Sequence, residues 1–213
     1  MPPRGAPLSA KTFMGCESIK KVIVPSGVKK LEESAFECGD NLEEIVLPDA
    51  LEEMGADCIS GNFKNFTIPG KIKKISKDAL SSAKIDKLTI SEGVEEIEAE
   101  AFKPRMYGGT LKAVCLPKSI KKIAENAFAA ENLYVYYAGT EKDKAKVSNL
   151  DTSVQNAVWV YEENNVPDYN FKFNKDKKTV TLTGSNILFQ KKFTAASFFD
   201  AAVKLICFRG YNH

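Results

Sequence analysis

The chain has almost no histidine. Its 213 residues include one histidine, at the last position, and one tryptophan. Catalytic triads and histidine metal sites therefore lack their central residue, and no GxxxxGK[ST] or GxGxxG motif occurs. Carboxylate pairs such as Glu95-Glu96 are present, but adjacent residues of a strand point to opposite faces. We expect no enzyme activity, no metal site and no cofactor; a glycosidase pair that converges across the fold is the alternative the sequence leaves open.

The chain also lacks an excess of one charge and a long apolar run. Lysine and arginine number 30 against 28 acidic residues, a net charge of +2, which does not suggest a nucleic-acid partner. Residues 1–10 carry one arginine and no apolar run, so we expect no secretory signal peptide in this chain. The apolar stretch near 198–206 is too short and too charged to span a membrane. Nothing in the sequence specifies the oligomeric state.

Cysteine is scarce and irregularly placed. The five cysteines are an odd number without CxxC spacing, which speaks against a disulfide framework or a zinc site. We expect buried free thiols that pack as small apolar groups. Cys16 and Cys38 occupy nearly equivalent slots in adjacent repeats, so a disulfide between them is the alternative.

What the sequence does contain is a repeat, clearest at residues 42–59. A large apolar residue recurs every 21 to 26 residues, followed by further apolar residues at fixed offsets and by a small-large pair such as Ala35-Phe36. A half copy ends at Phe13, so we expect the natural chain to extend further upstream. In the sixth copy this frame places Tyr136 and Ala138 in the core and Tyr137 facing outward. The copies, numbered repeats 1 to 6, open at Ile19, Leu42, Phe63, Ile85, Leu111 and Leu133.

A fixed period of this length with apolar residues in every unit predicts a stacked solenoid. The alternation in segments such as Leu88-Thr89-Ile90 predicts a strand with two side chains inward and one outward. One unit cannot close a core alone, so each contributes one layer to a continuous interior.

The pattern LxxIxLPxxLxxIxxxAFxxC over residues 8–138 resembles the BspA-like leucine-rich repeats, also called the Treponema pallidum type. This resemblance implies an α/β repeat solenoid that is predominantly β: a right-handed leucine-rich-repeat superhelix with short helical turns and a C-terminal cap. It also implies a secreted or cell-surface microbial protein that acts in adhesion and protein binding.

Charged pairs between the apolar positions alternate in sign from repeat to repeat. Because equivalent positions of neighbouring repeats lie about 4.8 Å apart in a sheet, opposite charges should attract weakly across each interface. We interpret the pairs as a structural ladder and not as binding patches, since alternating signs cancel their own field. The pairs are Lys29-Lys30, Glu52-Glu53, Lys73-Lys74, Glu95-Glu96 and Lys121-Lys122.

Two surfaces are candidate protein-binding sites. The outward residues of the central strands should form one row, and solenoids often bind partners through such a sheet; the alternative is that β-branched residues are simply good strand formers. The second candidate is the insertion at 103–110, whose Arg105, Met106 and Tyr107 have the composition of a contact point, against a tolerated length variant. The row consists of Ile23, Val46, Thr67, Thr89, Cys115 and Tyr137.

The sequence divides into four expected segments. These are a disordered N-terminal segment at 1–10, the repeat array at 11–139, a cap of a short helix and a strand at 140–163, and a linker, hairpin and poorly defined end at 164–213.

In the cap, Thr140 and Asp143 predict a helix N-cap with a weak capping box. Family resemblance predicts tryptophan at position 144, where this chain has lysine.

The expected function is a non-enzymatic protein-binding and adhesion module, with a host-surface, matrix or other microbial protein as its partner. The alternative is a structural stalk or targeting region of a larger, possibly enzymatic, protein.

Overall fold

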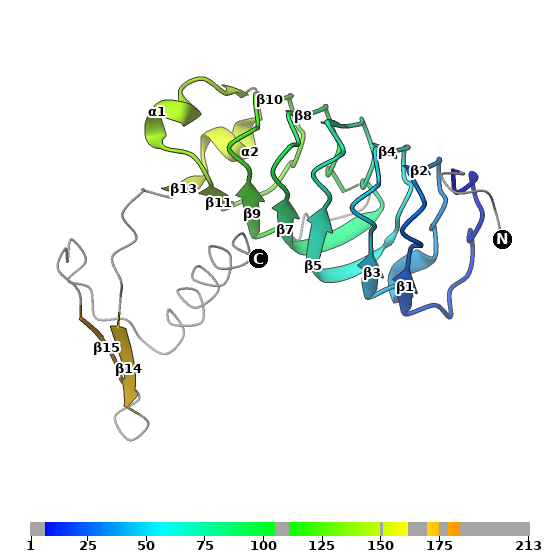
Figure 1. The fold of residues 1–213 in the computed structure, drawn as a ribbon, viewed down its shortest axis with the longest axis horizontal. Coiled ribbons are helices and arrows are strands. Elements are labelled where there is room, and N and C mark those ends of the chain that lie inside the picture. Colours follow the sequence, from blue (N-terminus) through cyan, green and yellow to red (C-terminus); the bar gives the residue numbers. More distant parts are fainter. Residues whose placement is uncertain (1–6, 105–110, 150, 162–169, 175–178, 184–213) are drawn as a thin grey trace. The chain divides into compact units, whose positions relative to one another are not determined.

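The computed structural model describes residues 7–104, 111–149, 151–161, 170–174 and 179–183 (Figure 1). The chain forms two compact units, residues 1–161 and 162–213. In the second unit the described residues form an antiparallel hairpin of β14, Asn170–Asn174, and β15, Thr179–Thr183.

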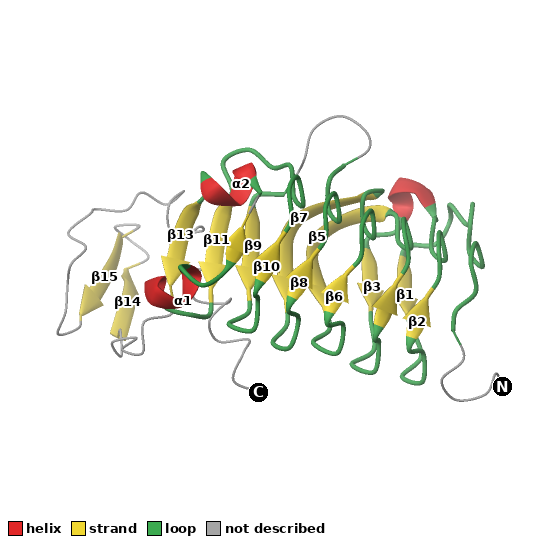
Figure 2. Cartoon of the chain, turned by 90° about the horizontal axis from the view of Figure 1, so that it is seen from above, coloured by secondary structure: helices red, strands yellow, loops and turns green. Residues whose placement is uncertain are grey.

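The first unit is a parallel β solenoid of about six turns, as the repeat predicted. Each turn contributes a strand to one side of the core and a two-residue strand to the other (Figure 2). The long-strand side consists of β1 Lys21–Ile23, β3 Glu44–Val46, β5 Gly61–Ile68, β7 Ala83–Ile90, β9 Ala113–Leu116, β11 Tyr134–Tyr137 and β13 Val158–Tyr161. The short-strand side consists of β2 Lys30–Leu31, β4 Glu53–Met54, β6 Lys74–Ile75, β8 Glu96–Ile97, β10 Lys122–Ile123 and β12 Ser148–Asn149.

The apolar positions of successive repeats stack in register and form the core. Phe66 pairs with Leu88 and Leu88 with Val114, and all three side chains are buried. Full burial of such side chains contributes roughly 1.5–3 kcal/mol each. The small-large pairs are also buried, and their aromatic rings stack between repeats: the centroids of Phe13 and Phe36 lie 5.1 Å apart. The predicted fold class is therefore confirmed.

The predicted register is wrong in repeat 6. Val135 pairs with Val114, Tyr136 with Cys115 and Tyr137 with Leu116. This repeat has one residue fewer between its first apolar residue and its strand than repeat 5 has. The side chain of Tyr137 therefore points into the core, where it is 1% exposed, and Tyr136 takes the outward position.

The last turn is closed by two short helices, α1 Glu141–Lys144 and α2 Thr152–Gln155; a 3-10 turn, η1 Gly39–Asn41, lies earlier in the array. Thr140 and Asp143 form the predicted capping box: each backbone N–H donates to the other's side chain, over 3.2 Å. Lys144 occupies the position where tryptophan was predicted. Its Nζ lies 4.2 Å from the ring centroid of Trp159, which β13 supplies. The tryptophan therefore packs on the cap from a different element.

The four described cysteines are free thiols, so the alternative disulfide between Cys16 and Cys38 is not formed. The Cys38 thiol donates to the Phe13 carbonyl over 3.5 Å, and the Cys58 thiol to the Ala79 carbonyl over 3.4 Å. Burial raises the pKa of both thiols above the ordinary value, so both stay neutral and unreactive near pH 7.

Candidate functional site

The outward face of the long-strand side, here called the strand face, carries most of the predicted row. Thr67, Thr89 and Cys115 are in register on β5, β7 and β9, and Ile23 is in register with Val46 on β1 and β3. Tyr137 does not belong to the row, because its side chain lies in the core.

Exposed large apolar side chains lie on this face at the two ends of the array, on β1 and β3 and on β13. Among the described residues four such side chains are strongly exposed, and three of them, Ile23 at 68%, Val46 at 46% and Val158 at 56%, point outward from long strands. The fourth, Met14, lies outside any strand. Because burying apolar surface drives association, these side chains are the ones that a partner would cover.

Access to the strand face is uneven along the array. Thr67 is exposed and Thr89 is half-buried, whereas Cys115 is only 3% exposed. Tyr136, which takes the position predicted for Tyr137, is also 3% exposed. The accessible part of the predicted row therefore runs from Ile23 to Thr89. The other predicted contact residues, Arg105, Met106 and Tyr107, lie outside the described residues.

The charge ladder forms at three of the four repeat interfaces where it was predicted. Repeats 1 and 2 are joined by pairs such as Lys29 Nζ to Glu52 Oε1 at 3.0 Å. Repeat 4 pairs with its neighbours on both sides, as in Lys121 Nζ to Glu95 Oε2 at 2.5 Å. The hydrogen bond from Lys121 holds the pKa of the Glu95 carboxyl below its usual value. Each exposed pair contributes little to stability, because water and salt screen its charges.

The ladder is missing between repeats 2 and 3. Within the described part of the chain no ion pair joins Glu52-Glu53 to Lys73-Lys74, and no backbone hydrogen bond joins β3 to β5 or β4 to β6. Both sides of the solenoid thus break at the same interface, which we call the seam. The inward side chains Ile45 and Leu47 beside it are only half-buried.

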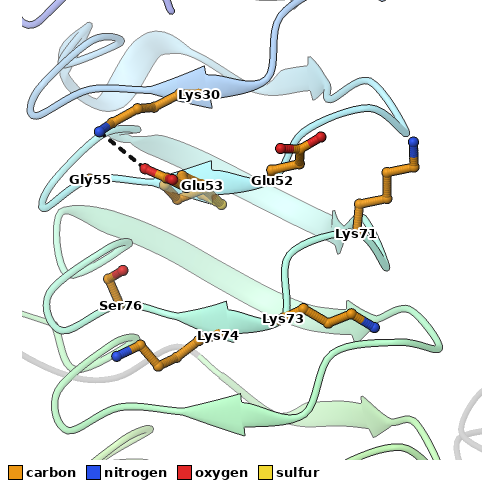
Figure 3. A pocket seen from close by; sticks show the side chains of 9 residues that line it. Lys30, Glu52, Glu53, Gly55, Lys71, Lys73, Lys74 and Ser76 are labelled. Atoms are coloured by element: carbon orange, nitrogen blue, oxygen red, sulfur yellow. Dashed lines mark ion pairs between the residues drawn. The ribbon is translucent and has the colours of Figure 1, made fainter.

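A pocket of about 650 Å³ opens at the seam on the short-strand side (Figure 3). Its β4 wall carries Glu52 and Glu53, and its opposite wall carries Lys71, Lys73 and Lys74. Sequence reasoning missed this site. The signal present was that the interval from Leu42 to Phe63, 21 residues, is the shortest in the array.

Repeats 2 and 3 are held together by the loops that join the two sides of the solenoid. The Asp57 amide donates to the Asp78 carbonyl over 2.9 Å, and the Ser82 hydroxyl donates to Asp57 Oδ1 over 2.8 Å. Lys84, the last residue of repeat 3, forms an ion pair of 2.5 Å with Asp40 at the end of repeat 1. On the long-strand side the Asn62 amide, at the start of β5, also donates to the Leu42 carbonyl over 2.8 Å. The seam is thus closed along its loops and at the start of β5, and open between β3 and β5 and between β4 and β6.

No group of three or more His, Cys, Asp or Glu side chains in the described residues is arranged to hold a metal ion. None of the helices described is long and apolar enough to cross a membrane.

Comparison with known proteins finds the BspA type leucine rich repeat region, in six copies over residues 6–107. The chain is similar to a leucine-rich repeat protein of Bacteroides ovatus, with 14% identity, coverage of 69% of this chain and 55% of that one, and a TM-score of 0.28. It is also similar to a leucine rich cell surface protein of Faecalibacterium prausnitzii, with 14% identity, 65% of each chain covered and a TM-score of 0.21. The chain thus spans less than two thirds of the length of either structure. The comparison with curated proteins gives no match.

Proposed function

The repeat array of this chain belongs to the BspA type of leucine-rich repeat family, and on that premise we propose that the chain is a non-enzymatic protein-binding module. The strand face is its binding surface, and its partner is a host-surface protein, a matrix component or another microbial protein. The family resemblance further implies adhesion at the cell surface or after secretion.

One observation carries this proposal: three of the four strongly exposed large apolar side chains among the described residues share the strand face. Such side chains become favourable when a partner removes them from water, at roughly 25 cal/mol per Å² of apolar surface. Ile23 and Val46 lie side by side on β1 and β3, next to the ion pair between Lys21 and Glu44 at 2.7 Å. An apolar centre with a charged edge is the usual anatomy of a protein interface.

The proposal is tested by a pull-down of extracellular matrix and cell-surface proteins with the full chain. We compare it with a triple variant, Ile23→Lys, Val46→Lys and Thr67→Lys, which changes outward side chains only. Met14→Lys is the matched control, because it charges an equally exposed apolar side chain away from the strand face.

We expect a captured partner to be lost with the triple variant and kept with the control, while circular dichroism shows both to be folded. Equal capture by the chain and the triple variant contradicts the strand-face assignment, and capture of nothing by the unchanged chain contradicts the proposed function.

A further inference from the structure

The β4 wall of the seam presents backbone groups that no neighbouring strand uses. The amides of Glu53 and Gly55 donate to repeat 1. Because the backbone groups of a strand alternate between its two edges, the N–H and C=O of Met54 face the seam. Within the described residues, β4 pairs only with β2.

The β6 wall is complementary. The carbonyls of Lys73 and Ile75 accept hydrogen bonds from repeat 4. The N–H and C=O of Lys74 and the N–H of Ser76 therefore face the seam, and β6 pairs only with β8 in the part of the chain described. Unpaired edges of this kind are templates for an added strand.

The charges around the seam select an anionic occupant. Glu53 is already paired with Lys30 at 3.0 Å, and Lys74 with Glu98 at 2.7 Å. Lys71 makes no ion pair among the described residues. Lys73 is paired with Glu95 at 3.7 Å, and Glu52 with Lys29 at 3.0 Å. Lys71 is therefore the positive charge in excess at the pocket, which is lined by the lysines Lys30, Lys71, Lys73 and Lys74 and by the glutamates Glu52 and Glu53.

We propose that the seam is a second binding site, which takes a short, extended, acidic peptide segment of a partner protein. Its backbone pairs with the free edge of β6, as in other cases of strand addition, and its carboxylates meet Lys71, Lys73 and Lys74. The chain itself shows the same arrangement between repeats 4 and 5, where the acidic strand β8 pairs with the basic strand β10 and Glu96 meets Lys122 at 2.6 Å.

Binding requires the seam to widen. Cα atoms of β4 and β6 approach within 8 Å of each other. A strand inserted between them needs about twice the 4.8 Å strand spacing. The loops around Asp57 hold repeats 2 and 3 together. These loops therefore act as a hinge, and the edges of β4 and β6 separate. This site lies on the short-strand side and does not depend on the strand face, so either assignment stands if the other fails.

The test uses a fluorescent peptide with the sequence of residues 93–99, Gly-Val-Glu-Glu-Ile-Glu-Ala, because this acidic segment pairs with β6 within the chain. Fluorescence anisotropy follows its binding to the full chain. We expect saturable binding, about a tenfold weaker affinity for Lys71→Glu, and a change within about twofold for the control Lys64→Glu, an exposed lysine of the same repeat away from the pocket. A peptide with lysine in place of its three glutamates should not bind.

Hydrogen exchange provides the second measurement. The acidic peptide should slow exchange of the Lys74 and Ser76 amides, which face the seam, and leave the amides of β7 unchanged. Absence of saturable binding, equal effects of Lys71→Glu and Lys64→Glu, or binding without protection of the β6 edge would each overturn the proposal.

Discussion

Residues with a left-handed backbone recur at one corner of the solenoid. They precede every small-large pair, as Asp57 precedes Cys58-Ile59 at φ 48° and Asn126 precedes Ala127-Phe128 at φ 53°. Aspartate and asparagine, which fill three of the six positions, tolerate this conformation better than other side chains do. The corner lets a small residue and a large one enter the core in succession. The set is Lys11, Ser34, Asp57, Asp78, Glu100 and Asn126.

The strain at this corner is testable at Asn126, which is exposed. Asn126→Val should lower the free energy of unfolding by about 1–2 kcal/mol, because a β-branched residue is disfavoured at positive φ, whereas Asn126→Gly should be neutral or stabilising. Urea denaturation followed by circular dichroism measures both. The control is Glu125→Val, an exposed neighbour with ordinary φ, and an equal loss there would show that the corner is not the cause.

Asp151 is a buried carboxylate that joins the last repeat to its cap. One oxygen accepts the Val154 amide at the start of α2 over 3.0 Å, and the other accepts the Phe128 amide over 2.9 Å. Both donors are thereby satisfied away from water. Asp151 belongs to no motif from which its role could be predicted from the sequence.

Asp151→Ala should cost about 2–4 kcal/mol of unfolding free energy, because it removes a helix N-cap and leaves the Phe128 N–H buried without an acceptor. Asp151→Asn keeps the shape but replaces one acceptor with a donor, so its unfolding free energy should lie between those of the unchanged chain and the alanine variant. Thermal unfolding of the three proteins gives the comparison. Equal stability of the alanine variant would mean that water replaces both contacts.

At the scale of elements, helix α1 depends on the ionised form of Asp143. Hydrogen bonds from Lys146 and from Thr140 hold the pKa of this carboxyl well below its usual range. A lowered folded-state pKa means stability that is present above the unfolded value, about 3.9 for aspartate, and is lost as the pH falls toward the folded value. The cap should therefore loosen in acid.

We expect the urea midpoint of the cap to fall as the pH is lowered from 5 toward 2, with a smaller change for Asp143→Asn. The fluorescence of the single tryptophan, Trp159, reports on the cap, because its indole N–H donates to Val154 and its ring contacts Tyr137. Denaturation at several pH values measures the effect. The same pH dependence in both proteins would assign it to other carboxylates, such as those of the ladder.

At the scale of the repeat array, the seam divides the solenoid into two hydrogen-bonded blocks. Repeats 1 and 2 form one, and repeats 3 to 6 with the cap form the other. In a stacked array stability is a sum of repeat terms and interface terms, so the interface without strand pairing and without the ladder ion pairs is the weakest point among the described repeats.

Hydrogen exchange in low urea should reveal the division. Amides of β1 to β4 should exchange through a partial opening of lower free energy than amides of β7, β9 and β11, which require global unfolding. One common opening energy for all these strands would contradict the division. A variant that stabilises only the seam should bring the opening free energies of these two sets of amides closer together.

The amino-acid sequence by itself determined the repeat, the core positions and the ladder between most repeats. These depend on side chains that recur at fixed offsets, and each repeat buries them in the same way. Phe66, Leu88 and Val114 are therefore found in the core as predicted. The capping box of Thr140 and Asp143 was also predictable, because it spans only three residues.

The tertiary structure alone decided the register of repeat 6 and the seam. A one-residue change in the connection before β11 reverses which side chains face the core, so Tyr137 is buried and Tyr136 takes the row position. The signs of Glu52-Glu53 and Lys73-Lys74 are as favourable as at any other interface. Whether these glutamates and lysines meet depends on how far repeat 2 is displaced from repeat 3. The loops between the two repeats set this displacement, and the sequences of β4 and β6 do not contain it.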